Sequence, residues 1–153
     1  MLSKKLAVEG FPLLYSVMLE ISAEKICHVL SVILVSLESG SPVVFHCAQG
    51  KDRTGIIAML IEAIVESERS PNIIPNYAAS EKFLPEWEAK RDILEAGVQK
   101  GDFVSTLRGS PAEGMEGTLA YVRSQWGSVE AYLDHAGFDG KRRRRLRAVF
   151  GKL

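Results

Sequence analysis

Cys47 and Arg53 are the two residues of this sequence whose types and spacing point most directly to chemistry. Apolar residues before Cys47 predict a short buried strand over residues 42–46, and the apolar run after Gly55 predicts a helix. The loop between them therefore ends at a helix N-terminus, where unpaired N–H groups and the helix dipole favour an anion. The same groups, together with the Arg53 guanidinium, favour the thiolate of Cys47, which is the nucleophilic form of cysteine.

If the anion is a phosphate monoester, each residue type in the loop has a role. We expect Cys47 to attack phosphorus and form a phosphocysteine, while the planar guanidinium of Arg53 binds two phosphoryl oxygens. Thr54 can donate its hydroxyl to the sulfur, and His46 is expected to orient the loop through hydrogen bonds to the backbone. The residues expected to bind the phosphate are Ala48, Gln49, Gly50, Lys51, Asp52 and Arg53.

These residues resemble the signature of the cysteine-dependent phosphatases, which is His-Cys, five residues, then Arg followed by Ser or Thr. The sequence Gly-Lys-Asp-Arg-Thr-Gly over residues 50–55 is most similar to the atypical tyrosine phosphatases of bacteria, fungi and plants. Residues 10–19, 77–80 and 127–133 are similar to three further segments of that branch. The resemblance implies a protein tyrosine or dual-specificity phosphatase acting on a phosphotyrosine protein, with a phosphoinositide phosphatase as the alternative. Neither a metal nor a cofactor is expected.

The resemblance also implies an α/β fold in which a sheet surrounds the loop, yet the residues before Cys47 have mostly helical patterns. We expect a mostly helical form of the cysteine-phosphatase fold, with one strand over residues 42–46 and the rest of the sheet upstream. No aspartate precedes Asp52, although relatives take their general acid from an upstream loop, so Asp52 is the expected surrogate acid. Residues 1–153 then form a single domain, the C-terminal part of a tyrosine-phosphatase-like catalytic domain. The alternative is a phosphate-binding module with weak catalysis.

Helical periodicity predicts the elements that position the loop. The expected helices cover residues 11–20, 23–37, 54–66, 77–82, 85–95, 113–125, 128–135 and a last stretch that starts at Asp139. Ser22 and Ser128 are expected N-caps, because their hydroxyls can accept from the first free N–H groups of a helix. The apolar face of the second helix is formed by Ile26, Val29, Leu30, Ile33 and Leu34.

Two other interpretations of the loop are weak. A nucleotide-binding phosphate loop requires glycine where Phe45 stands and serine or threonine where Asp52 stands. A zinc site built from the adjacent pairs at residues 27–28 and 46–47 is disfavoured, because adjacent residues rarely both reach one metal. Cys27 is therefore expected to be a core residue.

Composition bounds the remaining possibilities. The chain has 153 residues, 46% apolar and 25% charged, with a formal net charge of zero, so no overall field attracts nucleic acid and no nucleic-acid partner is expected. A thiolate enzyme requires a reducing compartment, which makes the cytoplasm the expected location. The longest apolar run, residues 29–37, is too short to span a bilayer. The basic cluster from Lys141 to Arg147 predicts either a solvated helix face or contact with an anionic membrane.

Overall fold

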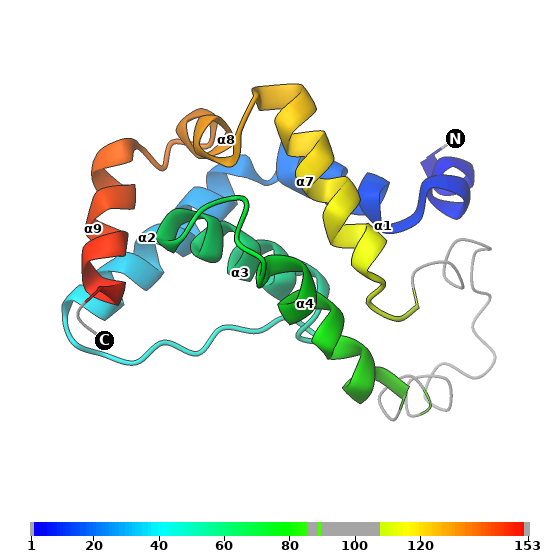
Figure 1. The fold of residues 1–153 in the computed structure, drawn as a ribbon, viewed down its shortest axis with the longest axis horizontal. Coiled ribbons are helices and arrows are strands. Elements are labelled where there is room, and N and C mark those ends of the chain that lie inside the picture. The colour runs from blue at the N-terminus through cyan, green and yellow to red at the C-terminus, as the bar shows by residue number, and fades with distance from the viewer. Residues whose placement is uncertain (1, 86–88, 90–107, 152–153) are drawn as a thin grey trace.

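The computed structural model describes residues 2–85, 89 and 108–151, and this part of the chain is built from helices (Figure 1). The elements are α1 (Leu2–Ile21), α2 (Ala23–Glu38), α3 (Asp52–Val65), α4 (Ile73–Ala78), the 3₁₀ helix η1 (Ala79–Phe83), α7 (Ala112–Trp126), α8 (Val129–His135) and α9 (Gly140–Phe150). The helix expected over residues 85–95 lies outside the described residues except at positions 85 and 89. Each of the other expected helices is confirmed, although α1 and α4 begin earlier than their patterns predicted.

The helix that follows the loop, α3, is the central element of the bundle. It contacts α2, α4, α8 and α9. Its buried residues are Ile56, Ile57, Met59, Leu60, Ala63 and Ile64. A helix that is apolar over so much of its circumference is stable only when neighbouring elements cover it. The surrounding helices therefore hold the N-terminus of α3, where the loop ends, in one place.

The first helix bends at Gly10, which has φ 59° and ψ −139°, a backbone conformation that only glycine adopts readily. Pro12 then lies in the first turn of the second half of α1, where its missing N–H costs no helical bond. This half packs closely on α7, because a Cβ at Gly117 would lie 2.7 Å from Cγ of Pro12. The close packing fixes the part of α1 that faces the loop.

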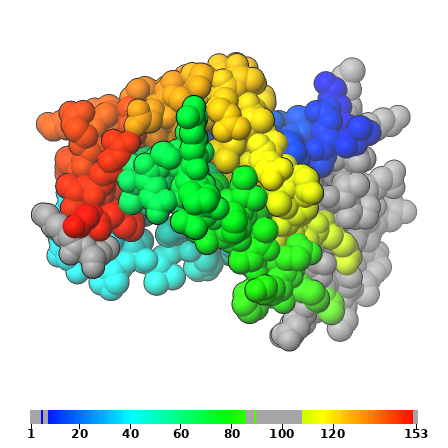
Figure 2. Space-filling view, in the orientation of Figure 1, coloured from blue at the N-terminus to red at the C-terminus, as the bar shows by residue number. Residues whose placement is uncertain are grey.

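The prediction of a strand over residues 42–46 was wrong, because these residues are extended but form no regular strand. The segment runs along one edge of the molecule, in cyan in Figures 1 and 2, and it forms no ladder with any other described part of the chain. An isolated strand leaves its main-chain N–H and C=O groups without partners, so the regular structure needs a neighbour that the described residues do not supply. The α/β architecture expected from the sequence is accordingly replaced by a helical one within the described ranges.

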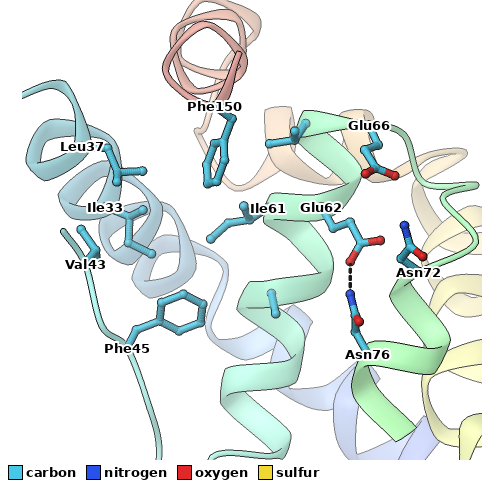
Figure 3. Close-up of a pocket in the computed structure, with 12 residues that line it drawn as sticks. Ile33, Leu37, Val43, Phe45, Ile61, Glu62, Glu66, Asn72, Asn76 and Phe150 are labelled. Carbon is cyan, nitrogen blue, oxygen red and sulfur yellow. Dashed lines mark hydrogen bonds between the residues drawn. The ribbon is translucent and has the colours of Figure 1, made fainter. Parts of the chain in front are cut away.

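A hollow of about 470 Å³ lies behind the extended segment (Figure 3). Val43 and Phe45 project into it from the segment, while Val44 between them is 91% exposed. Ile33 of α2 adds to the apolar side of the hollow. The opposite side is polar and includes Glu62 of α3, which accepts a hydrogen bond from Asn76 of α4 over 3.1 Å. The segment thus keeps the alternation of a strand without the sheet that would use it.

The outer face of α2 is also uncovered. Ile26, Leu30, Ile33 and Leu34 are buried as expected, but Val29 is 37% exposed. Val29 shares this outer side of α2 with Val32 and Val35, which are 51% and 62% exposed. The sequence pattern assigned Val29 to the core because it lies at helical spacing from the buried residues, at the margin of their face.

The expected helix caps were partly correct. The hydroxyl of Ser128 accepts from the Ala131 N–H over 3.0 Å, as predicted, and the carboxylate of Asp139 likewise accepts from the Arg142 N–H over 2.8 Å. Ser22 occupies the N-cap position of α2 as predicted, but its side chain makes no capping bond to the helix. Within the described ranges, each helix is too short or too polar to span a lipid bilayer.

Candidate active site

The loop that follows Cys47 is a sequence of bends leading directly into α3. Gly50 takes φ 70°, a left-handed conformation that disfavours residues with a Cβ. The first main-chain hydrogen bond of the helix joins the Gly55 N–H to the Lys51 carbonyl over 2.6 Å. The N–H groups of residues 52–54 therefore have no partner within the helix, and they form the anion-attracting end that the sequence predicted.

Cys47 lies where this loop begins, and hydrogen bonds stabilise its thiolate. Partial burial raises the pKa of the thiol, but the Thr54 hydroxyl and the N–H groups of Thr54, Gln49 and Lys51 outweigh that effect. Together they lower the pKa from its ordinary value of 9.0 to about 6. The Cys47 N–H donates to Oγ1 of Thr54 over 2.9 Å, which leaves the proton of that hydroxyl for the sulfur. At neutral pH the side chain is mainly a thiolate.

His46 contacts the backbone of the loop. Its Nδ1 lies 3.1 Å from the carbonyl oxygen of Cys47. Because a carbonyl oxygen only accepts hydrogen bonds, Nδ1 must carry the proton in this contact. The imidazole thereby restrains the peptide group that carries the nucleophile, which is the kind of contact an orienting residue makes.

Arg53 does not reach Cys47 in this conformation. It is exposed and lines a depression of about 220 Å³ between α1, α2 and α3, together with Met18 and Lys25. Among the residues that the structure describes, its guanidinium has no hydrogen-bond or ion-pair partner, and it is not one of the groups that shift the pKa of Cys47. Binding a phosphate at the loop would therefore require the side chain to turn toward Cys47, and no hydrogen bond or ion pair with another described residue holds it back.

Lys51 occupies a different place from the one its position in the loop suggested. The side chain is 1% exposed, and its Nζ donates to the carbonyl oxygen of Gly109 over 2.6 Å. The ammonium also lies 4.4 Å from the centre of the Phe11 ring and 3.5 Å from Oδ1 of Asp52. Because these groups enclose the ammonium, Lys51 offers an incoming anion only its backbone N–H.

Asp52, the first residue of α3, is held by a residue that the sequence analysis did not assign to the site. Oη of Tyr15 donates to Oδ1 of Asp52 over 2.6 Å, and Oη of Tyr77 lies 2.7 Å from Oη of Tyr15. Tyr15 and Tyr77 appeared in the sequence only within segments similar to known phosphatases. A tyrosine among apolar residues at helical spacing predicts core packing, so nothing local indicated contact with the loop.

Most of the arginines in the basic cluster from Lys141 to Arg147 bind other residues of the same chain. Arg143 forms a two-bond ion pair with Asp134, and Arg145 forms one with Glu38. Arg147 contacts Glu130 and the carbonyl oxygen of Ile64. These contacts attach α9 to α2, α3 and α8.

Comparison with known proteins agrees with the geometry of the loop. A model of the tyrosine phosphatase family matches residues 1–151. A tyrosine-protein phosphatase of Nostoc commune is 32% identical over 124 residues, which are 77% of this chain and 42% of that protein. The triple specificity protein phosphatase of Mycobacterium tuberculosis is 28% identical over 131 residues, 76% of this chain and 46% of that protein. The chain thus matches less than half the length of either relative, and it belongs to the tyrosine phosphatase family.

Proposed function

We propose that the chain hydrolyses phosphate monoesters of protein tyrosine through a phosphocysteine on Cys47. The observation that carries this proposal is the position of Cys47 at the N-terminus of α3, where the Thr54 hydroxyl and the loop amides surround its sulfur and lower the pKa of the thiol to about 6. A thiolate that exists at neutral pH beside free helical N–H groups has what nucleophilic attack on a bound phosphate requires. The family and the relative from Nostoc commune favour phosphotyrosine, and the name of the Mycobacterium tuberculosis relative, a triple specificity protein phosphatase, favours a broader range of substrates.

The reaction proceeds in two steps. The sulfur of Cys47 bonds to phosphorus as the ester P–O bond breaks, and Asp52 gives a proton to the departing oxygen. Water then attacks the phosphocysteine, Asp52 takes a proton from it, and the S–P bond breaks to return the thiolate. Arg53 turns toward the loop and binds two equatorial oxygens, where its fork stabilises charge in both transition states.

Phosphoinositides are the second candidate class of substrate, but the structure favours them less. A polyanionic inositol headgroup would suit a free lysine ammonium in the loop, but the interior of the protein encloses the ammonium of Lys51. Docking on an anionic membrane rested on the basic cluster, in which the side chains of Lys141 and Arg144 alone have no hydrogen-bond or ion-pair partner among the described residues. Two such charges contribute about 1 kcal/mol each near an anionic surface. We therefore propose a phosphoprotein substrate, met in the cytoplasm where a thiolate stays reduced.

Hydrolysis of p-nitrophenyl phosphate tests the proposal. We expect turnover that persists in excess chelator and is blocked by vanadate, since the mechanism uses a thiolate and an arginine. Cys47→Ser should abolish turnover while the loop still binds inorganic phosphate, and Arg53→Lys should also be nearly inactive because an ammonium lacks the planar fork. Cys27→Ser, which changes the other free cysteine, is the matched control and should keep full activity.

Two outcomes would contradict the proposal. Turnover in Cys47→Ser that equals the wild-type rate would remove the nucleophile from the mechanism. Phosphate binding without any turnover in the wild-type chain would favour the alternative function, a phosphate-binding module in which the loop is intact and catalysis is absent.

A further inference from the structure

A pair of buried tyrosines connects three helices beside the loop. Tyr15 of α1 is fully buried and Tyr77 of α4 is 4% exposed, and their rings meet edge to face with centres 6.0 Å apart. The two hydroxyl oxygens are 2.7 Å apart, and Oη of Tyr15 lies 2.6 Å from Oδ1 of Asp52 at the start of α3. The hydroxyl groups and the carboxylate thus form one short chain of hydrogen bonds.

The direction of this chain follows from proton counting. Tyr15 has one hydroxyl proton, which it donates to Asp52, so the contact with Tyr77 is made by the proton of Tyr77. Burial is the main cause that raises the pKa of Tyr15, and the nearby charge of Asp52 raises it further. Burial likewise raises the pKa of Tyr77. Both phenols therefore stay protonated, and Tyr15 is a permanent donor to Asp52.

The sequence places the donor through two local features. Gly55, in the first turn of α3, lets the Tyr77 ring approach, because a Cβ there would be only 3.0 Å from Cδ2 of Tyr77. On α1, Phe11 and Tyr15 stand four residues apart on one face, with ring centres 5.6 Å from each other. The ring of Phe11 contacts the Lys51 ammonium, and the hydroxyl of Tyr15 donates to the Asp52 carboxylate. This face of α1 therefore contacts both residues at the end of the loop.

The contacts of Asp52 distinguish its two oxygens. Oδ1 accepts from Tyr15 and lies 3.5 Å from Nζ of Lys51. Every contact of this carboxyl group with the described residues is made through Oδ1, and the side chain is 19% exposed. Because donors occupy Oδ1, a proton carried by the carboxyl group belongs on Oδ2.

We propose that Tyr15, supported by Tyr77, is a positioning residue that fixes Oδ1 of Asp52 and makes Oδ2 the oxygen that delivers the proton. The inference rests on the proposed function, in which Asp52 is the acid. As the S–P bond forms and the ester P–O bond breaks, the proton moves from Oδ2 to the departing oxygen. In the second step Oδ2 takes a proton from the attacking water as the S–P bond breaks. Tyr15 keeps its own proton throughout.

The test compares two esters that differ in how much they need an acid. Loss of Tyr15 as donor in Tyr15→Phe should lower kcat for phosphotyrosine about 10-fold or more, while kcat for p-nitrophenyl phosphate changes by less than about 2-fold. KM should stay unchanged for both esters, because no substrate contact is removed. In the Asp52→Asn background the same substitution should add no further change to the ratio of the two rates.

Two further tyrosine variants guard against an effect of stability alone. Tyr132→Phe removes another buried hydroxyl, which lies away from the loop and donates to the carbonyl oxygen of Leu19 over 3.1 Å. This variant should leave the ratio of the two rates unchanged. Tyr77→Phe keeps the Tyr15–Asp52 bond and should shift the ratio in the same direction as Tyr15→Phe, by a smaller factor. If Tyr15→Phe slows both esters equally, or matches Tyr132→Phe, the inference is overturned.

An NMR measurement separates failure of this inference from failure of the proposed function. The hydroxyl proton of Tyr15 should exchange slowly with solvent. Its chemical shift should change strongly in Asp52→Asn and remain unchanged in Cys47→Ser. A chain that cleaves neither ester would overturn the proposed function and, with it, the catalytic role given to Oδ2. If the chemical shift of the Tyr15 hydroxyl proton is the same in Asp52→Asn as in the wild-type chain, the positioning of Asp52 by Tyr15 is overturned, whatever the activity.

Discussion

Thr54→Val should raise the pKa of Cys47, and the expected size follows from the contacts of the loop. The Thr54 hydroxyl is the foremost of the groups that lower this pKa to about 6 against the opposing effect of burial. A hydrogen bond to a charged group contributes about 1.5–3 kcal/mol. Since about 1.4 kcal/mol corresponds to one pKa unit, removing the hydroxyl should raise the pKa by about 1–2 units, to about 7–8.

The rate of alkylation by iodoacetamide, measured from pH 5 to 10, reports this pKa because only the thiolate reacts. The Cys27→Ala background leaves Cys47 as the single thiol. At pH 6.5 about three quarters of the wild-type side chain should be thiolate, compared with about a quarter or less in Thr54→Val. Thr54→Ser keeps the hydroxyl and should restore the wild-type profile.

Thr118→Val is the matched control for this measurement. Thr118 is buried in α7, where its hydroxyl donates to the carbonyl oxygen of Gly114 over 2.6 Å, so its loss should leave the titration of Cys47 unchanged. A midpoint that stays near 6 in Thr54→Val would show that the loop amides alone stabilise the thiolate. A midpoint near 9 in the wild-type chain would refute the loop geometry itself.

Two further outcomes are expected of the whole chain. The Cys47 thiol loses its proton near pH 6 in the folded state, whereas an ordinary thiol, as in the unfolded chain, loses it near pH 9. The free energy of unfolding should therefore rise as pH increases from 6 to 9, and this contribution is lost once pH has fallen through 6. Urea unfolding at several pH values should show this rise, and Cys47→Ala should reduce it. The exposed valines on α2 should make the chain associate at high concentration. In sedimentation runs, Val32→Lys should reduce association without lowering the melting temperature. Unchanged association would show that the exposed valines of α2 do not mediate it.

The features that the sequence predicted correctly depend on neighbouring residues. The loop ends at the start of α3 because Gly50 permits the turn and an apolar run follows Gly55, both within a few positions of Cys47. The cap at Ser128 likewise uses a residue three positions away. Ser22 fits the same rule and fails because its side chain makes no bond to the helix, which the pattern of residue types does not reveal.

The features that were missed depend on residues distant in the chain. Lys51 is buried because Phe11 and Gly109 supply a ring and a carbonyl oxygen from elements 40 and 58 positions away. The role of Tyr15 depends on Asp52, 37 residues later. The strand over residues 42–46 fails for the same kind of reason, because an alternating apolar segment becomes a strand only when another strand pairs with it.

The unpaired segment before Cys47 links the fold to the chemistry. The bond from the Cys47 N–H to Thr54 and the amides around the sulfur belong to the loop and α3. Residues 42–46, in contrast, form no ladder with any other described residues that would fix the position of Cys47. Stabilisation of the thiolate is therefore a local property of the loop, while alignment of the sulfur with phosphorus depends on the backbone that precedes it. The chain should therefore combine an acidic thiol, with a pKa near 6, with slow turnover, which iodoacetamide alkylation and hydrolysis of p-nitrophenyl phosphate measure on the same sample.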